Sequence, residues 1–162
     1  MGAIIWKSNR IYLNDTIDLF ANVTEGSCEI KRKMTEVDGM GLPAGLNVPS
    51  GRFEPITATF NFNNIDPTMI RQFIVQDGFC RFRMIGNCMG VNTLSGVLVQ
   101  DIMTTTIHGF SDGIPIPPMK ASEASEVEVT VNVSFISINN RSGQLFMLDI
   151  MNGLMFPKNV LG

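Results

Sequence analysis

The sequence predicts a mainly β fold, a β-sandwich or half-open barrel with one flanking α-helix and one long extended loop. Side chains alternate between apolar and polar over several segments, only one segment has helical spacing, and one glycine- and proline-rich stretch interrupts the strands. The chain has 162 residues, of which 44% are hydrophobic and 17% charged, so it is long enough to bury a core as a single domain over 1–162.

The clearest strand is EVEVTVNVSF, residues 126–135. Valine recurs at every second position, and the positions between carry Glu126, Glu128, Thr130 and Asn132. Successive side chains of a strand point to opposite faces, so this strand has one apolar face and one wet, mildly acidic face. The alternation slips by one residue near the end of the segment, which predicts a bulge near residues 135 and 136 or the end of the strand.

The same alternation recurs in ITATFNFN, residues 56–63, with Ile, Ala and Phe on one face and Thr and Asn on the other. Further strands are predicted in RIYLND, SCEIKRKMTEV, FCRFRMI, TLSGVLVQDIMTTTI and QLFMLDI. Roughly six to eight strands are enough for a sandwich or a half-open barrel. Their faces and edges are rich in Thr, Asn and Ser, which favours pairing with other copies.

One helix is predicted over 66–76, within NNIDPTMIRQFIVQDG. Asp66 is a typical N-cap, Pro67 suits the first helical position, and Asp77-Gly78 ends the helix. We expect about three turns that lie across a sheet through a single apolar stripe. Its members are Met69, Ile70, Phe73 and Ile74.

The stretch DGMGLPAGLNVPSGRFEP is predicted to form an extended loop over 38–52. It contains glycines, prolines and apolar side chains, and almost nothing that could do chemistry. A loop of this length in a compact chain is usually functional or disordered. Its glycines miss the GxGxxG spacing, Pro43 interrupts them, and a strand follows where a phosphate-binding loop needs a helix.

Catalysis and tight binding of nucleic acid are both disfavoured. His108 is the only histidine, and no catalytic signature surrounds it. The 12 basic and 15 acidic residues give a net charge of −3, whereas a protein that grips nucleic acid needs a basic face. We therefore expect no enzyme, no catalytic, cofactor-binding or metal-ligating residue, and no cofactor.

Cys28, Cys80 and Cys88 are an odd number of cysteines without zinc-type spacing. They are interpreted as buried or half-buried thiols in a reducing cytosol, and the alternative is that they cross-link adjacent subunits after release from the cell. No stretch reaches the roughly 18 apolar residues of a membrane span, and the short apolar run at the start does not fit a secretory signal. We expect a protein made in a cytoplasm, with no membrane anchor.

Several sequence features follow one another in a characteristic order over about residues 9–156. A charged strand enters a Gly-Met-Gly/Pro loop in CEIKRKMTEVDGMGLPAG, a strand and the helix follow, and the chain closes with SFISINNRSGQLFMLDIMNGLMF. This order resembles the major tail tube protein of contractile-tailed bacteriophages, a family that includes the tubes of R-type bacteriocins.

The resemblance implies a structural virion protein that forms hexameric rings by edge-strand pairing. The rings would stack into the inner tail tube, through which phage DNA passes into the host when the sheath contracts. The implied partners are other copies of the chain, the tail sheath protein outside, the tape measure protein and then DNA in the lumen, and baseplate and tail terminator proteins at the tube ends. Assembly would take place in the bacterial host cytoplasm, and the protein would reside in the virion tail.

In this interpretation two surfaces have roles. The 38–52 loop is an arm that reaches the next ring, and its expected contacts are Met40, Leu42, Pro43, Leu46, Val48 and Pro49. The base-free face that carries Glu126, Glu128, Thr130 and Asn132 is the candidate lining of the channel, because lysine or arginine there would hold DNA.

Two alternatives stay open. The same architecture would serve a type six secretion system or another non-phage contractile injection apparatus. A chain of this size could also be a small β-barrel module that binds a ligand or an oligosaccharide, which would be a monomer rather than a tube.

Overall fold

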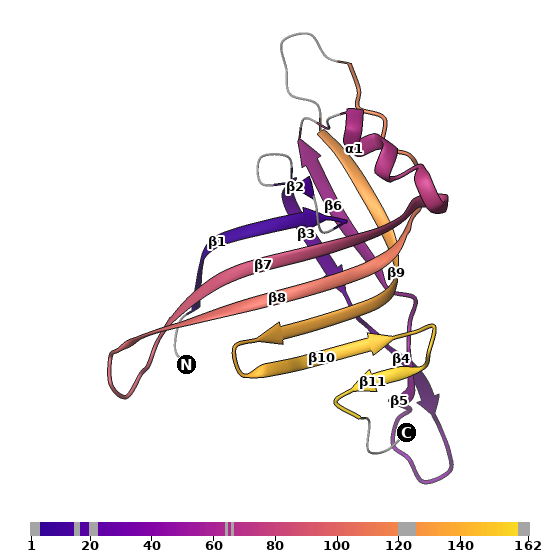
Figure 1. Ribbon diagram of the computed structural model, residues 1–162. Helices are drawn as coiled ribbons and strands as arrows, with labels where there is room; N and C mark the ends of the chain where they lie inside the picture. Colours follow the sequence, from indigo (N-terminus) through magenta and orange to yellow (C-terminus); the bar gives the residue numbers. More distant parts are fainter. Residues whose placement is uncertain are drawn as a thin grey trace.

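The computed structural model describes residues 4–14, 17–19, 23–63, 65, 67–119 and 126–158. The fold is mainly β, as predicted, with one α-helix beside sheets that do not close (Figure 1). The elements in chain order are β1 (Ile4–Leu13), β2 (Ile17–Asp18), β3 (Val23–Glu29), β4 (Arg32–Val37), β5 (Leu46–Phe53), β6 (Thr57–Asn63), α1 (Pro67–Gln72), a 3-10 turn (Val75–Gly78), β7 (Phe79–Val91), β8 (Leu98–Ser111), β9 (Glu126–Asn140), β10 (Gly143–Asp149) and β11 (Leu154–Phe156).

Nine strands of the described chain form one branched sheet that bends into two layers, and β9 belongs to both. The first layer is β3, β6 and the first half of β9. The second layer runs from β11 through β10, the second half of β9, β8 and β7 to β1 and β2. Figure 1 shows the first layer crossing the second steeply. The layers are joined along β9 and open on the opposite side, which makes the fold a half-open barrel.

A bulge in β9 lies where the two layers meet. Two consecutive residues of β8, His108 and Gly109, pair with residues two apart in β9, so Ser134 is an extra residue. The slip in the sequence alternation predicts the bulge one or two residues later, near residues 135 and 136. In the structure, β9 continues past the bulge to Asn140. A Cβ at position 109 would overlap the main-chain carbonyl of Asn132, so glycine permits the close approach of the two strands here.

The core lies between the two layers and is built around four phenylalanines. Phe60 of β6 stacks on Phe82 of β7, with ring centroids 4.0 Å apart. Phe73, just beyond α1, lies 6.4 Å from Phe82 and meets Phe62 of β6 edge-on at 5.8 Å. All four are almost completely buried, and stacked or edge-on aromatic pairs add to the free energy of apolar burial. The predicted inward face of residues 56–63 is therefore confirmed.

The helix is shorter than predicted. α1 covers 67–72 instead of 66–76, and a 3-10 turn over 75–78 follows it. Two residues inside that turn have φ of 56°, a left-handed conformation that an α-helix cannot contain. The early end leaves Ile74 54% exposed, although Met69 is buried as predicted. The predicted N-cap, Asp66, lies outside the described residues.

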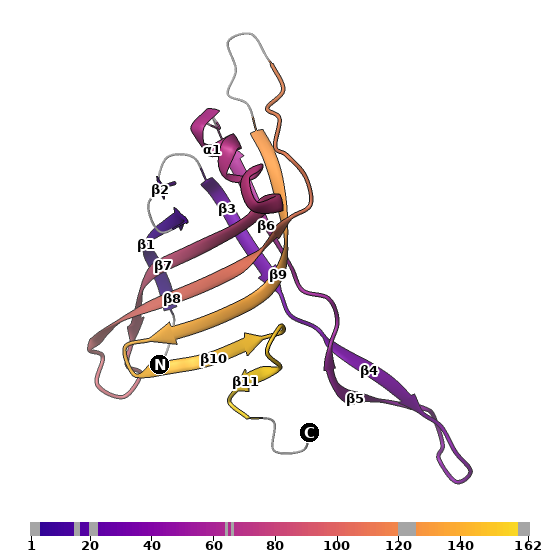
Figure 2. The same ribbon diagram turned by 45° about the vertical axis from the view of Figure 1, so that its right-hand side comes forward.

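The prediction of an extended loop over 38–52 is wrong for its second half. Strand β5 pairs with β4 as an antiparallel hairpin, so only 38–45 is a loop. Pro49 is compatible with a strand here because a two-stranded hairpin leaves one edge of each strand unpaired. Gly51, with φ of 85°, lies within the irregular part of the pairing. The hairpin projects from the body as a separate ribbon (Figure 2).

The stacked phenylalanine pair gives a test of the core. Phe82→Ala removes a fully buried ring and should lower the free energy of unfolding by about 3–5 kcal/mol. Urea denaturation of the unassembled subunit measures this change. Phe110→Ala is the matched control, since Phe110 is 45% exposed and its removal should cost about 1 kcal/mol. Similar losses for the two variants would contradict the assigned core.

Candidate functional surfaces

The β4–β5 hairpin, which we call the arm (residues 32–53), has no core of its own. All side chains from 32 to 47 are exposed, and the arm pairs with no other strand of the described chain. A hairpin of two strands is only marginally stable in water when nothing covers it. Nothing in the described residues covers the arm, which makes it a candidate surface for contact with another chain.

The arm presents apolar side chains near its tip. Met40 is fully exposed, Leu42 is 48% exposed and Leu46 is 60% exposed. Two more apolar residues, Met34 and Val37, are also about half exposed. These two are not among the contacts predicted from the sequence, because they lie in SCEIKRKMTEV, a segment whose most evident feature is its charge. The other predicted contacts are Pro43 and Pro49, which are exposed, and Val48, which is half-buried.

The polar face of β9 exists as predicted. Glu126, Glu128 and Asn132 are exposed and Thr130 is half-buried, while the valines between them point into the core. The face continues across β6 and β3, because all three strands pair in register. The resulting cross-strand rows are Glu128–Asn61–Glu25, Thr130–Thr59–Ser27 and Asn132–Thr57–Glu29. We call this surface, β3–β6–β9, the acidic face.

The contribution of β3 to the acidic face was not predicted. The segment SCEIKRKMTEV is predicted as one strand, whereas the structure divides it at Ile30 and Lys31 between β3 and β4. The alternation of Glu25, Ser27 and Glu29 is the signal that could have separated the two.

The acidic face has a negative electrostatic character. Its outward positions carry four glutamates, and no lysine or arginine occupies an outward position of the three strands. Lys31 lies just beyond the end of β3, with its Nζ 3.6 Å from Oε1 of Glu29. Both side chains are exposed, so solvent screens this pair strongly. A polyanion that approached this face would be repelled.

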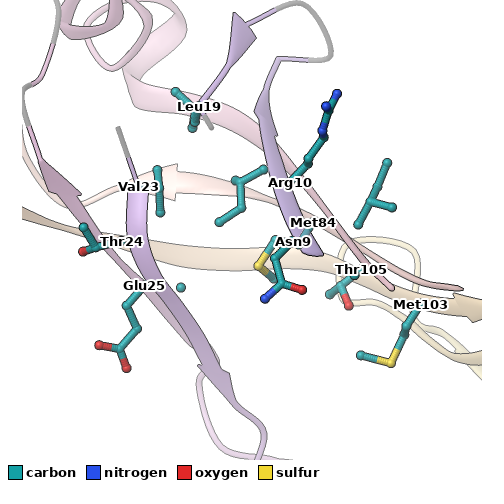
Figure 3. A pocket seen from close by; sticks show the side chains of 13 residues that line it. Asn9, Arg10, Leu19, Val23, Thr24, Glu25, Met84, Met103 and Thr105 are labelled. Atoms are coloured by element: carbon teal, nitrogen blue, oxygen red, sulfur yellow. The ribbon is translucent and has the colours of Figure 1, made fainter. Parts of the chain in front are cut away.

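A pocket of about 430 Å³ lies at the open side of the half-barrel. In Figure 3, Thr24 and Glu25 of β3 lie on one side, Asn9 and Arg10 of β1 on the other, and Met84 of β7 between them. The lining contains neither histidine nor cysteine, and it has no nucleophile paired with a base. The pocket lies in the seam between the edges of β1 and β3. The groups that it offers are therefore the backbone N–H and C=O groups of two strand edges rather than catalytic side chains.

His108 is held between aromatic rings. Its ring centroid lies 4.9 Å from that of Phe135 and 6.3 Å from that of Phe79. This is a packing environment for a half-buried imidazole. Among the residues that the structure describes, no three His, Cys, Asp or Glu side chains are grouped as a metal site, and no helix is long and apolar enough to cross a membrane.

The three cysteines are free thiols in different environments. Cys80 is completely buried, with its Sγ 3.7 Å from the carbonyl oxygen of Gly109, and burial raises its pKa to about 12. No thiol of another copy can reach it in the folded subunit. Cys28 and Cys88 are half-buried, and burial also raises the pKa of Cys28. Cross-linking through these two stays a prediction.

Comparison with known proteins gives one family. Residues 7–155 match the family model described as "Phage tail tube protein FII". No curated protein matches the chain. A chain in the solved structure titled "Cryo-EM structure of the anti-feeding prophage (AFP) baseplate, 6-fold symmetrised" is similar at 11% identity, over 93% of this chain and 95% of that chain, with a TM-score of 0.42. A TM-score this low supports no conclusion, so the family match is the informative finding.

The buried thiol of Cys80 should make stability depend on alkaline pH. Folding raises its pKa from 9.0 to about 12, so its contribution is fully present below pH 9 and is lost as the pH rises towards 12. Cys80→Ala should therefore weaken the fall in unfolding free energy between pH 8 and 10.5 by about 2 kcal/mol or less. Urea midpoints at the two pH values measure this slope. The Cys88→Ala control should keep the slope of the unmodified protein, and equal slopes in both variants would contradict the assignment.

Proposed function

The chain belongs to the phage tail tube family, and we propose that it polymerises as stacked hexameric rings that form the inner tube of a contractile tail. The tube conducts phage DNA into the host when the surrounding sheath contracts. The observation that carries the proposal is that one chain combines a half-open barrel with an arm that has no core of its own. Each feature leaves backbone or apolar groups that another copy can cover.

The open seam supports ring formation. Within the described residues β3 has a hydrogen-bonded neighbour on one edge only, and β1 has β2 beside just its last two residues on the edge away from β7. Strand edges of this kind pair readily with other chains. In a closed ring each such edge finds a partner in a neighbouring copy, which removes the risk of uncontrolled aggregation.

The acidic face supports the role of channel lining. DNA must pass the wall of the tube without being held, and each lysine or arginine that contacts a phosphate would add to binding. Glutamates, threonines and asparagines on this face offer no such contact. We therefore assign the acidic face, with Glu126, Glu128, Thr130 and Asn132, to the lumen.

The remaining partners follow from the tube. A sheath protein would surround it, a tape measure protein and then DNA would occupy the lumen, and baseplate and tail terminator proteins would cap its ends. Assembly would occur in the cytoplasm of the bacterial host, and the product is a component of the virion.

Electron microscopy of the purified protein tests the proposal. Negative stain over a range of protein and salt concentrations should show rings and tubes. Deletion of residues 40–48 should leave subunits that stack poorly, because it removes the tip of the arm. The deletion touches no residue of the core, so the variant should keep the urea midpoint of the unmodified subunit within error and should lose only the β signal of the three β4–β5 pairs that it removes. Small monodisperse particles from the unmodified protein under every condition would refute the tube, and unchanged tubes from the variant would refute the role of the arm.

The channel lining can be tested by adding positive charge. Thr59→Lys with Thr130→Lys places two lysines in the middle row of the acidic face. Tubes of this variant should bind a short DNA duplex at 50 mM salt. If about six of the new lysines contact phosphates together, affinity should fall about a thousandfold by 200 mM. Fluorescence anisotropy of labelled DNA measures the binding.

The matched control carries lysines at Thr93 and Ser142, two exposed turn positions away from this face. It adds the same charge to each subunit, so stronger binding by the control than by the face variant would place the lumen elsewhere.

A further inference from the structure

We propose that the tip of the arm of one copy docks into a groove at the root of the arm of another copy. This inference rests on the proposed tube and adds the receiving site of the arm. The chain carries both halves of the contact, which are complementary in charge and in apolar character.

The groove lies between the root of the arm and the C-terminal strands, and has a volume of about 810 Å³. Its apolar lining comes from four strands: Phe53 of β5, Ile138 of β9, Phe146 of β10 and Met155 of β11. These side chains are only half-buried in the isolated subunit. Covering them with apolar groups of another chain would be favourable by about 25 cal/mol for each Å² removed from water.

The rim of the groove is cationic. Arg32, Arg52 and Lys158 line it, and no acidic side chain does. All three are exposed, and none forms a salt bridge with any described residue. On a chain with a net charge of −3, this is a local concentration of unpaired positive charge.

The tip of the arm has the opposite character. Glu36 and Asp38 are the only charged residues from 34 to 51, and they stand beside the exposed apolar side chains of Met40 and Leu42. Gly41, with φ of 92°, and a hydrogen bond from the amide of Leu42 to the carbonyl of Gly39 (3.2 Å) form the turn at this tip. The tip therefore offers apolar groups and two carboxylates together, as the groove requires.

The tip cannot fill the groove of its own chain. β4 and β5 are paired along their length, so they hold the tip away from the root (Figure 2). The last pair of the hairpin, Val37–Leu46, lies three residues beyond Met34–Pro49, so the turn that carries Met40 and Leu42 is at least about 10 Å from the groove lining at roughly 3.3 Å per residue. The contact is therefore heterologous, from the tip of one copy to the root of another, and repetition of it builds an open stack. The length of the arm then sets the spacing between successive layers of the stack.

A charge swap tests this contact. The tip variant is Glu36→Lys with Asp38→Lys, and the groove variant is Arg32→Glu with Arg52→Glu. Each places like charges together and should raise the protein concentration needed for tube assembly by about tenfold or more. The swap variant, with all four substitutions, restores opposite charges and should assemble within about threefold of the unmodified protein. Sedimentation and negative-stain microscopy measure the assembly.

A matched control separates complementarity from net charge. The tip substitutions combined with Arg71→Glu and Arg141→Glu give the same net charge as the swap variant, but change two exposed arginines outside the groove. This control should remain defective. Equal recovery by the control and the swap variant would overturn the proposal, because the effect would then be one of total charge.

A photo-crosslinking amino acid at position 40 gives an independent readout. In assembled tubes it should form adducts with residues of the groove, identified by mass spectrometry, and adducts confined to other surfaces would overturn the proposal. If tip and groove variants both assemble as the unmodified protein does, the docking contact is wrong while the tube function stands. Failure of the unmodified protein to form any tube would instead refute the proposed function, and this contact with it.

Discussion

The rest of the structure depends on the backbone hydrogen bonds of β9. Along one edge β9 pairs first with β6 and then with β10, and along the other edge it pairs with β8. Ser134 makes the exchange possible, because one extra residue bends the strand between its two partners. The extra residue also reverses which side chains point inward, so Ile136 is buried after a run of buried odd-numbered valines. One strand thus positions the acidic face, the aromatic core and the second layer of the sheet relative to each other.

This arrangement separates the tasks of the surface. The first layer turns carboxylates and hydroxyls outward from the same backbone that points Phe60 and Phe62 into the core. The arm leaves the body between β3 and β6, so it is anchored at both ends to this layer. The acidic face is well solvated by water, whereas open strand edges and exposed apolar side chains of the arm are stabilised when another chain covers them. The core stabilises the subunit, while its open strand edges and its arm remain exposed, and these are the surfaces that the proposed tube would cover.

The sequence predicted the features that depend on a period of two residues. The inward and outward faces of β6 and β9 follow from alternation alone, because burial of one face fixes the register. The arm could not be recognised as a hairpin, since proline and glycine are typical of loops and only the pairing with β4 shows that Pro49 lies in a two-stranded hairpin, where one edge of each strand is free for it. The helix ends at Gln72, before a left-handed backbone at Gln76 and Asp77, and the apolar stripe that continues to Ile74 does not reveal this early end. The groove joins Phe53 to Met155 and is a product of tertiary structure.

The uncovered arm also has a kinetic consequence. A ribbon that is only marginally stable alone spends part of its time disordered, and ordering each residue costs about 1–2 kcal/mol of conformational entropy. A first tip-to-groove contact between two free subunits must meet that cost for the arm that docks, with little surface yet buried in return. In the proposed tube, a subunit that joins an existing end also covers its open strand edges, so more surface is buried for the same cost. We therefore expect the proposed tube to nucleate slowly and elongate readily, so that the template that begins it would govern the number and length of tubes.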